Sequence, residues 1–290
     1  MWRRGFRNFM EPNGAKLVLA DWLKSQQRDA NPFKFRVVNI WEEKPPTSET
    51  INLLSEEYMV ANISPKALKI ALGKLKDDCG ELNLQEFQKY VEDNLTDEGE
   101  TSTIVGSFGE IISTNYLIQF EKYWLPVYKL RYREKKNWAM RMTDVFVVST
   151  DDNKKPIVSY GEVKTNTSGY QGNIGIEGHN SIKRDNALEN PDILRFIINT
   201  LCDQGKDNEA SFFIDVQLNK VHYETKHKLF LIHDTRFWKD KILENLNASE
   251  LDSALQDFTV YPVLIDNLRT LIDDSFKNSW RAAEVIANAK

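Results

Sequence analysis

Four charged residues interrupt segments in the middle of the chain that are otherwise apolar. Glu110 lies in the run TIVGSFGEIISTNYLIQF, Asp144 begins the run DVFVVST, and Glu162 and Lys164 end the run PIVSYGEVK. Burying a charge without a partner costs free energy, so we expect these side chains to have a structural or chemical role. Carboxylates that hold a divalent cation, with an ammonium group beside them, can activate water for hydrolysis.

The turn between the last two runs places Asp144 opposite Glu162. The turn, TDDNKKP, is dense in turn-forming residues, and a hairpin symmetric about Asn153 pairs residue 144 with residue 162. We expect their Cβ atoms to lie about 5 Å apart on one face of the sheet. Lys164 shares that face with Glu162, whereas Val163 points to the other. Two ionised carboxylates so close together repel each other, and a divalent cation between them would neutralise this repulsion.

The oxygen-rich donor set predicts Mg²⁺, with Mn²⁺ as a substitute, rather than zinc. The predicted metal ligands are Asp144, Glu162 and the main-chain carbonyl of Val163, and Glu110 ligates a second metal directly or through water. Lys164 orients or helps to deprotonate the attacking water. A reading without chemistry stays open, in which Asp144 and Lys164 form a surface ion pair, Glu162 is solvated, and Glu110 favours a helix dipole from the first turn.

A segment rich in basic residues precedes the hairpin and offers a track for a charged substrate. Between residues 122 and 141 basic side chains outnumber acidic ones, and aromatic side chains interleave with them. The candidate phosphate contacts are Arg131, Arg133, Lys135, Lys136 and, at the start of a later helix, Lys183. The alternative is a solvated sheet edge that lysines protect from pairing.

Hydrophobic periodicity predicts the elements that position these residues. Before residue 100 it indicates helices at 15–26 and 64–76, a strand at 33–41, a linker at 42–50 and a helix that carries Leu84, Phe87 and Val91. After the polar run at 96–103, it indicates helices at 104–122, 181–201, 239–247 and 267–288, and strands at 126–133, 142–149, 156–164, 210–218, 227–233 and 258–265.

This order of elements indicates an α/β fold, with a mixed sheet flanked by helices and antiparallel strands on one side. We place a boundary in the polar run. Residues 1–100 form a smaller, mainly helical α+β region, and residues 101–290 form the domain with the charged residues.

Composition narrows the class of protein. The 290 residues carry a formal net charge of −5, so no overall positive field attracts nucleic acid. Cys79 and Cys202 stand far apart and without a CxxC motif, which fits a reducing cytoplasm. The apolar stretch near the N-terminus is interrupted by Asp21 and is too short for a membrane span or a signal peptide. We therefore expect a soluble cytoplasmic protein without a membrane partner, and the chain has no GxxxxGK[ST] loop for ATP hydrolysis.

The charged residues and their order resemble a known superfamily. A glycine–glutamate pair on a helix, then a strand with Asp144, then a hairpin partner with E-V-K, is similar to the PD-(D/E)xK nucleases. Thr143 stands where the superfamily's name has proline, which leaves the metal ligand in place. More narrowly, VGSFGEIISTNYL, YREKKNWAMRMTDVFVV and GEVKTNTS resemble the HamA family, the nuclease subunit of the Hachiman anti-phage defence system.

The resemblance implies a restriction-endonuclease-like fold and Mg²⁺-dependent hydrolysis of DNA, largely independent of sequence. It also implies a separate helicase subunit as partner, with residues 1–100 as the candidate docking or regulatory module. Two other functions stay open: a catalytically silent adaptor that binds nucleic acid or a partner, and an effector that cleaves RNA on the same fold.

Overall fold

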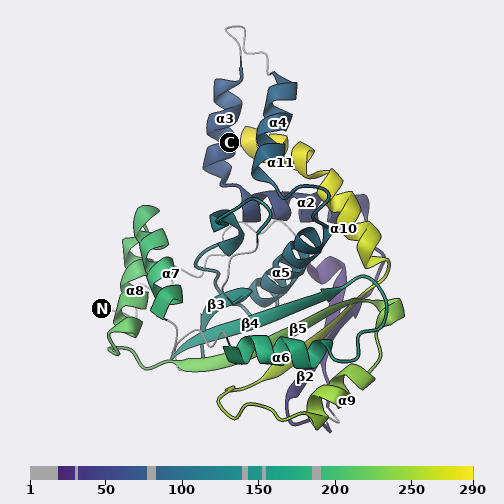
Figure 1. Ribbon diagram of the computed structural model, residues 1–290. Coiled ribbons are helices and arrows are strands. Elements are labelled where there is room, and N and C mark those ends of the chain that lie inside the picture. Colours follow the sequence, from purple (N-terminus) through teal and green to yellow (C-terminus); the bar gives the residue numbers. More distant parts are fainter. Residues whose placement is uncertain are drawn as a thin grey trace.

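A six-stranded mixed sheet forms the centre of the protein in the computed structural model (Figure 1). The structure describes residues 19–29, 32–76, 83–138, 143–151, 155–184 and 191–289. The strand order is β1-β2-β6-β5-β4-β3. The strands are β1 (Leu23–Gln27), β2 (Arg36–Glu42), β3 (Val145–Thr150), β4 (Pro156–Asn166), β5 (Glu224–Asp234) and β6 (Thr259–Ile265). The predicted α/β class with a mixed sheet is confirmed.

The two outer pairs of the sheet, β1–β2 and β3–β4, are antiparallel, and β2, β6, β5 and β4 run parallel. In the β3–β4 hairpin, Val145 pairs with Gly161 and Thr150 pairs with Pro156. This is the register predicted from the turn. One step beyond its last pair stand Asp144 and Glu162.

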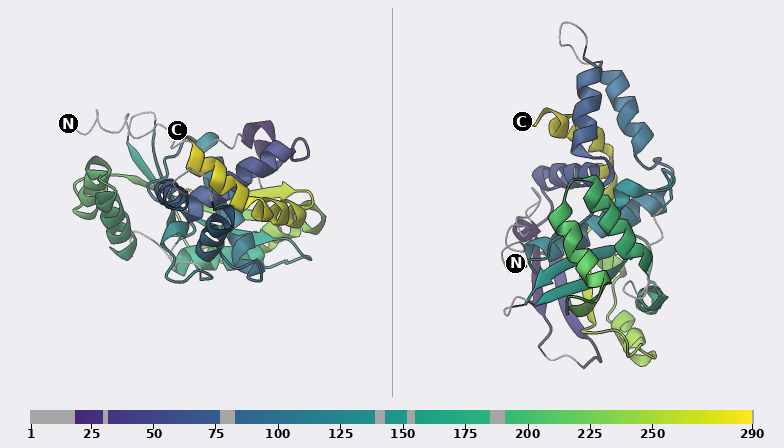
Figure 2. Two further views of the ribbon diagram at one scale, coloured as in Figure 1. Left: turned by 90° about the horizontal axis from the view of Figure 1, so that it is seen from above. Right: turned by 90° about the vertical axis from the view of Figure 1, so that its left-hand side faces the viewer.

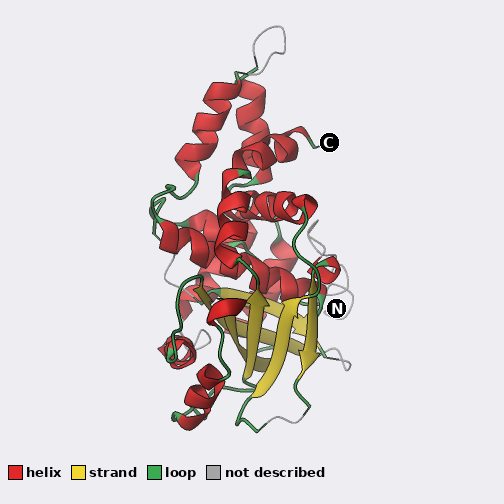
Figure 3. Ribbon diagram, turned by 90° about the vertical axis from the view of Figure 1, so that its right-hand side faces the viewer, coloured by secondary structure: helices red, strands yellow, loops and turns green. Residues whose placement is uncertain are grey.

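Helices cover both faces of the sheet (Figures 1 and 3). They are α2 (Ser48–Asn62), α3 (Pro65–Lys74), α4 (Leu84–Asn94), α5 (Thr101–Gln119), α6 (Ile174–Arg184), α7 (Pro191–Asp203), α8 (Asp207–Gln217), α9 (Lys241–Ala248), α10 (Leu268–Lys277) and α11 (Ser279–Asn288). Short 3₁₀ helices are η1 (Leu19–Asp21), η2 (Lys129–Tyr132) and η3 (Thr235–Phe237).

Alternate residues of the parallel strands face two separate cores. Phe230 and Ile232 of β5 pack with α5, α2 and α10 on one face. Leu229 and Leu231 of the same strand pack with α6 and α9 on the other. This period of two is the expected pattern for a strand buried on both sides. The α7–α8 pair packs on β3 and β4 in a third core that includes Phe146 and Tyr160 (Figure 1).

The segment before residue 100 contributes to the same sheet and core as the rest of the chain. Its strand β2 pairs with β6, and its helices α2 and α3 pack against α11 near the C-terminus. Helices α2 and α10 pack against α5, and the α3–α4 pair projects away from the sheet (Figure 2, right-hand view). One continuous sheet therefore joins the residues before and after residue 100. The role of residues 1–100 in partner docking stays a prediction.

Several predicted elements differ from the structure. The strand predicted at 210–218 is helix α8, since Phe212, Phe213 and Val216 lie on its buried side at helical spacing. The strand predicted at 126–133 is η2 with a loop before it, and only Trp124 of that loop bridges the sheet, at Val148. The closing helix is two helices that meet at Asn278.

The beginning of the chain also differs from the prediction. Within the helix predicted at 15–26, residues 15–18 lie outside the described part, and the rest forms η1 and β1. Helix α2 begins in the predicted linker, where Thr47 and Thr50 form a capping box. Residue 142 of the strand predicted at 142–149, and residues 185–190 of the helix predicted at 181–201, also lie outside the described ranges. No helix in the described part of the chain is long and apolar enough to cross a membrane.

Candidate active site

Asp144 lies directly before β3, and its carboxylate is fixed on the main chain of β4. The Val163 amide donates a hydrogen bond to Asp144 Oδ2 at 2.9 Å. The preceding residue, Thr143, donates from its hydroxyl to the Gly161 carbonyl at 3.0 Å. These two bonds continue the hairpin beyond its last ladder pair, so the aspartate is held in place without being part of the strand.

Glu162 and Lys164 extend from the same face of β4, as their spacing predicts. Lys164 Nζ lies 2.8 Å from Glu162 Oε1 and 3.4 Å from the hydroxyl of Ser181 on α6. The Glu162 side chain is only 9% exposed. The reading of a surface ion pair between Asp144 and Lys164 with a solvated Glu162 is therefore wrong.

Glu110 reaches the cluster from the middle of α5, so the reading of a glutamate in the first helical turn is wrong. Its neighbour Gly109 allows α5 to pack closely on β4. A Cβ atom at Gly109 would overlap Thr165 Oγ1 and lie 3.0 Å from Val163 Cγ1. The missing side chain at Gly109 therefore leaves room for two side chains of β4.

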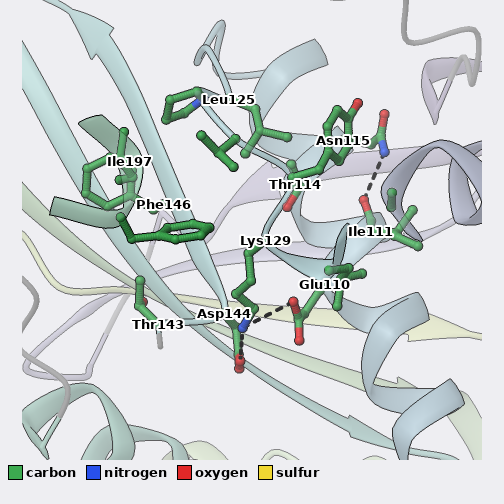
Figure 4. A pocket seen from close by; sticks show the side chains of 16 residues that line it. Glu110, Ile111, Thr114, Asn115, Leu125, Lys129, Thr143, Asp144, Phe146 and Ile197 are labelled. Atoms are coloured by element: carbon green, nitrogen blue, oxygen red, sulfur yellow. Dashed lines mark hydrogen bonds and ion pairs between the residues drawn. The ribbon is translucent and has the colours of Figure 1, made fainter. Parts of the chain in front are cut away.

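Lys129, at the start of η2, joins Glu110 to Asp144 (Figure 4). Its ammonium nitrogen lies 3.0 Å from Asp144 Oδ1 and 3.3 Å from Glu110 Oε2. The side chain is 10% exposed, so the ion pairs are shielded from water. The cluster therefore contains three carboxylates and two ammonium groups from α5, η2, β4 and the residue before β3.

Burial sets the electrostatics of the cluster. It raises the pKa of Glu110 from its usual 4.5 to about 7, although Lys129 opposes the shift. It also raises the pKa of Glu162 to about 7, and the Asp144 carboxylate adds to this effect. Burial lowers the pKa of Lys129, but Glu110 and Asp144 outweigh it and leave the pKa above its usual value. Near neutral pH, Lys129 therefore carries its positive charge, and burial opposes ionisation of both glutamates.

The donor set fits a hard divalent cation. Among the described residues, no three His, Cys, Asp or Glu side chains converge as a ready-made cation site. Magnesium commonly uses one or two protein carboxylates and keeps several waters, which Asp144 and Glu162 can satisfy. Burial makes the ionised carboxylates costly in free energy. A cation that prefers oxygen ligands would offset this cost. A cavity of about 50 Å³ adjoins Glu110, Lys129 and Asp144 and is otherwise lined largely by apolar side chains.

A comparison with models of known protein families identifies the family of this chain. The model of the HamA family matches residues 19–279, which include the sheet and all five charged residues of the cluster. The chain belongs to the HamA family. A comparison with curated proteins found no match. Membership of this family indicates a component of a Hachiman antiviral defence system, as the resemblance predicted.

The basic segment of this HamA-family chain has structural contacts of its own. Arg131 donates to the Val60 carbonyl at the end of α2, and Arg133 donates to the Thr96 and Ser107 hydroxyls. These bonds tie η2 and the residues after it to the helical layer, so both guanidinium groups are occupied within the protein.

The three predicted phosphate contacts that are lysines lie nearer the surface. Lys136 forms an ion pair with Asp97, and Lys135 lies 4.1 Å from the centre of the exposed Trp138 ring. Lys183, on α6, is 61% exposed and 3.8 Å from Asp252. Phosphate contact by these side chains stays a prediction.

Lys129 is the residue of the cluster that sequence reasoning did not assign. It was grouped with the basic segment, because no regular spacing relates it to Glu110 or Asp144. Ser181 was missed for the same reason, since it comes from α6, beyond the hairpin.

Proposed function

We propose that this chain is a metal-dependent nuclease that hydrolyses DNA phosphodiester bonds with little sequence preference, in a defence complex with a helicase. The observation that carries the proposal is the meeting of Asp144, Glu162 and Lys164 at one end of the β3–β4 hairpin, in the predicted register. Glu110 joins them through Lys129.

Each residue has a part in hydrolysis. A bound Mg²⁺ would act as Lewis acid and lower the pKa of water, with Asp144 and Glu162 as protein ligands. The Val163 amide keeps the Asp144 carboxylate oriented, and the Val163 carbonyl is a further candidate ligand. Lys164, already 2.8 Å from Glu162, is placed to orient the attacking water and to offset negative charge on the phosphate. Glu110 is the candidate ligand for a second metal, directly or through water.

The charge of the protein supports a need for a partner. The net charge is −5, and Arg131 and Arg133 of the basic segment bond within the protein. We expect weak, salt-dependent binding of DNA by the chain alone. A helicase subunit that is loaded on DNA raises the local concentration of substrate at the nuclease without any new contact to bases.

The test is DNA cleavage by the chain alone, with its helicase partner, and with partner and ATP. We expect cleavage to require Mg²⁺ or Mn²⁺, to stop with EDTA, and to be highest with partner and ATP. Ca²⁺ should allow binding with little turnover, because its larger and looser ligand shell positions water poorly.

The matched variants are Asp144→Asn and Glu162→Gln, which keep the shape of each side chain and remove its charge. Both should abolish cleavage. Lys155→Met is the control, because Lys155 pairs with Glu224 at the far end of β4. Cleavage that resists EDTA, or full activity of Asp144→Asn, contradicts the proposal. Cleavage of RNA in place of DNA would support the same hydrolytic mechanism with RNA as the substrate.

A further inference from the structure

Lys129 occupies the side of Asp144 that a metal ion would use. Asp144 has two carboxylate oxygens, of which Oδ2 accepts the Val163 amide and Oδ1 accepts the Lys129 ammonium. The Oδ1 contact is 3.0 Å, and the same ammonium is 3.3 Å from Glu110 Oε2. Both predicted metal ligands on this side of the cluster are therefore already paired with a positive charge.

The position of Lys129 is set by the contacts of its own segment. Directly after it, Arg131 donates two bonds to Val60 and lies over the ring of Tyr128. The loop before it bridges the sheet through Trp124 and Val148. Held at both ends, η2 presents the lysine to the carboxylates as a fixed part of the site, unlike a flexible surface side chain.

An ammonium group and a divalent cation cannot share these oxygens without cost. Mg²⁺ binds carboxylate oxygen at about 2.0–2.1 Å, which would put it a few ångströms from an ammonium that keeps its present contact. At that separation a single and a double positive charge repel strongly in a partly buried site, where little water screens them. Metal entry therefore requires the ammonium to withdraw, or the negative charge of a bound phosphate to offset the repulsion.

We propose that Lys129 is a built-in competitor of the catalytic metal: its ammonium neutralises Glu110 and Asp144 in the metal-free chain and weakens the binding of divalent cations. The proposal rests on the proposed nuclease function, since it takes Asp144 as a metal ligand. It predicts that the free chain holds metal loosely and that binding tightens when substrate phosphate is present.

The experiment is calorimetric titration of the full chain with Mn²⁺ alone, without DNA. Lys129→Met removes the charge and keeps an apolar stem of similar length. We expect it to bind Mn²⁺ about tenfold more tightly, or better, than the unaltered chain. Lys155→Met, which breaks an exposed ion pair with Glu224 beside the far end of β4, should bind Mn²⁺ as the unaltered chain does. Equal or weaker binding by Lys129→Met overturns the proposal.

A second readout guards against misfolding. Thermal unfolding with and without Mn²⁺ should show a larger metal-dependent rise in melting temperature for Lys129→Met than for the unaltered chain. If that variant shows no cooperative transition, Lys129→Gln replaces it, because glutamine removes the charge and keeps a hydrogen-bond donor on the side chain.

The double variant Lys129→Met/Asp144→Asn separates this proposal from the proposed function. Loss of the tight Mn²⁺ binding in the double variant supports both. Retained tight binding shows that Asp144 is not a ligand, and both then fail. If Asp144→Asn alone lowers Mn²⁺ binding while Lys129→Met leaves it unchanged, the metal site stands and the competition by Lys129 is refuted.

Discussion

The two lysines of the cluster are held by different parts of the molecule. Lys164 lies on β4, an inner strand, and its partner Glu162 is two residues away on the same face. Lys129 lies on a short 3₁₀ helix outside the sheet and reaches Asp144, 15 positions along the chain. Main-chain pairing sets the first geometry, and side-chain anchors set the second. Under the proposed nuclease function, Lys164 would serve a constant catalytic role, and the role of Lys129 would change with the occupancy of the metal site.

Lys164→Met is the substitution that sharpens this contrast most. It should lower the single-turnover rate of DNA cleavage by about 10²–10³-fold, because the group that offsets charge on the phosphate is lost. Mn²⁺ affinity should change much less, since the carboxylate ligands remain. The cleavage rate of Lys164→Met at saturating Mg²⁺ is compared with the rate of the control Lys155→Met. The control should cleave as fast as the unaltered chain. Mn²⁺ binding that tightens in Lys164→Met as much as in Lys129→Met would erase the distinction between the two lysines.

The pH dependence of stability tests whether Glu110 and Glu162 are both buried in the metal-free chain. Because the folded-state pKa values of Glu110 and Glu162, about 7, exceed the usual 4.5, the folded state binds more protons than the unfolded state between these values. The free energy of unfolding of the metal-free chain should therefore fall as pH rises from about 4.5 to about 7, on the order of 3 kcal/mol for each glutamate.

Urea unfolding at several pH values measures this loss. Glu110→Gln and Glu162→Gln should each reduce the slope, because the variant side chains do not titrate. Mn²⁺ should also reduce it, since the metal favours the ionised carboxylates. An unchanged slope in both variants would show that other groups cause the pH dependence.

Two glycines of α5 test how the helix positions Glu110. Gly109→Ala should destabilise the protein by about 1–3 kcal/mol, because the new methyl group meets Thr165 and Val163. Gly106→Ala, with no atom within 4 Å of its added Cβ, should stabilise it by about 1 kcal/mol through helix propensity. Chemical denaturation measures both, and equal effects would mean that α5 does not need its close contact with β4.

The anchor of η2 gives the smallest expected effect. Arg131→Met removes the bonds to the Val60 carbonyl and should cost about 1–2 kcal/mol of stability. Arg195→Met, which breaks only an exposed pair with Asp192, should cost about 0.5 kcal/mol or less. If the segment is held as described, Arg131→Met also loosens Lys129 and tightens Mn²⁺ binding. A variant as stable as Arg195→Met would show that η2 is held by other contacts.

The hairpin could be predicted from sequence because its information is local. A turn of known composition and the period of two determine the partners of Asp144, Glu162 and Lys164. Helix α5 was also predictable, since its apolar residues recur over several turns. The family resemblance rested on these same segments, and the family match confirmed it.

The rest of the site and fold depended on contacts between distant segments. The residues 126–133 alternate like a strand, but Arg131 bonds to α2 and the segment turns away from the sheet. The short apolar run at 210–218 suits a strand or a helix, and packing against β3 and β4 selects the helix. Nothing in the local pattern could place Lys129 between two carboxylates from other elements.

The strand order has a consequence for how the protein is made. β2 emerges early from the ribosome, but its neighbour β6 comes late: Arg36 pairs with Thr259, 223 positions later. A nascent chain that has not reached β6 leaves β2 and β5 each with an unpaired edge, which invites association with other chains. The strand that carries Glu162 and Lys164 lies directly beside β5. A chain arranged in this way cannot complete its sheet before nearly its whole length has been translated, and any product that ends before β6 keeps two exposed strand edges.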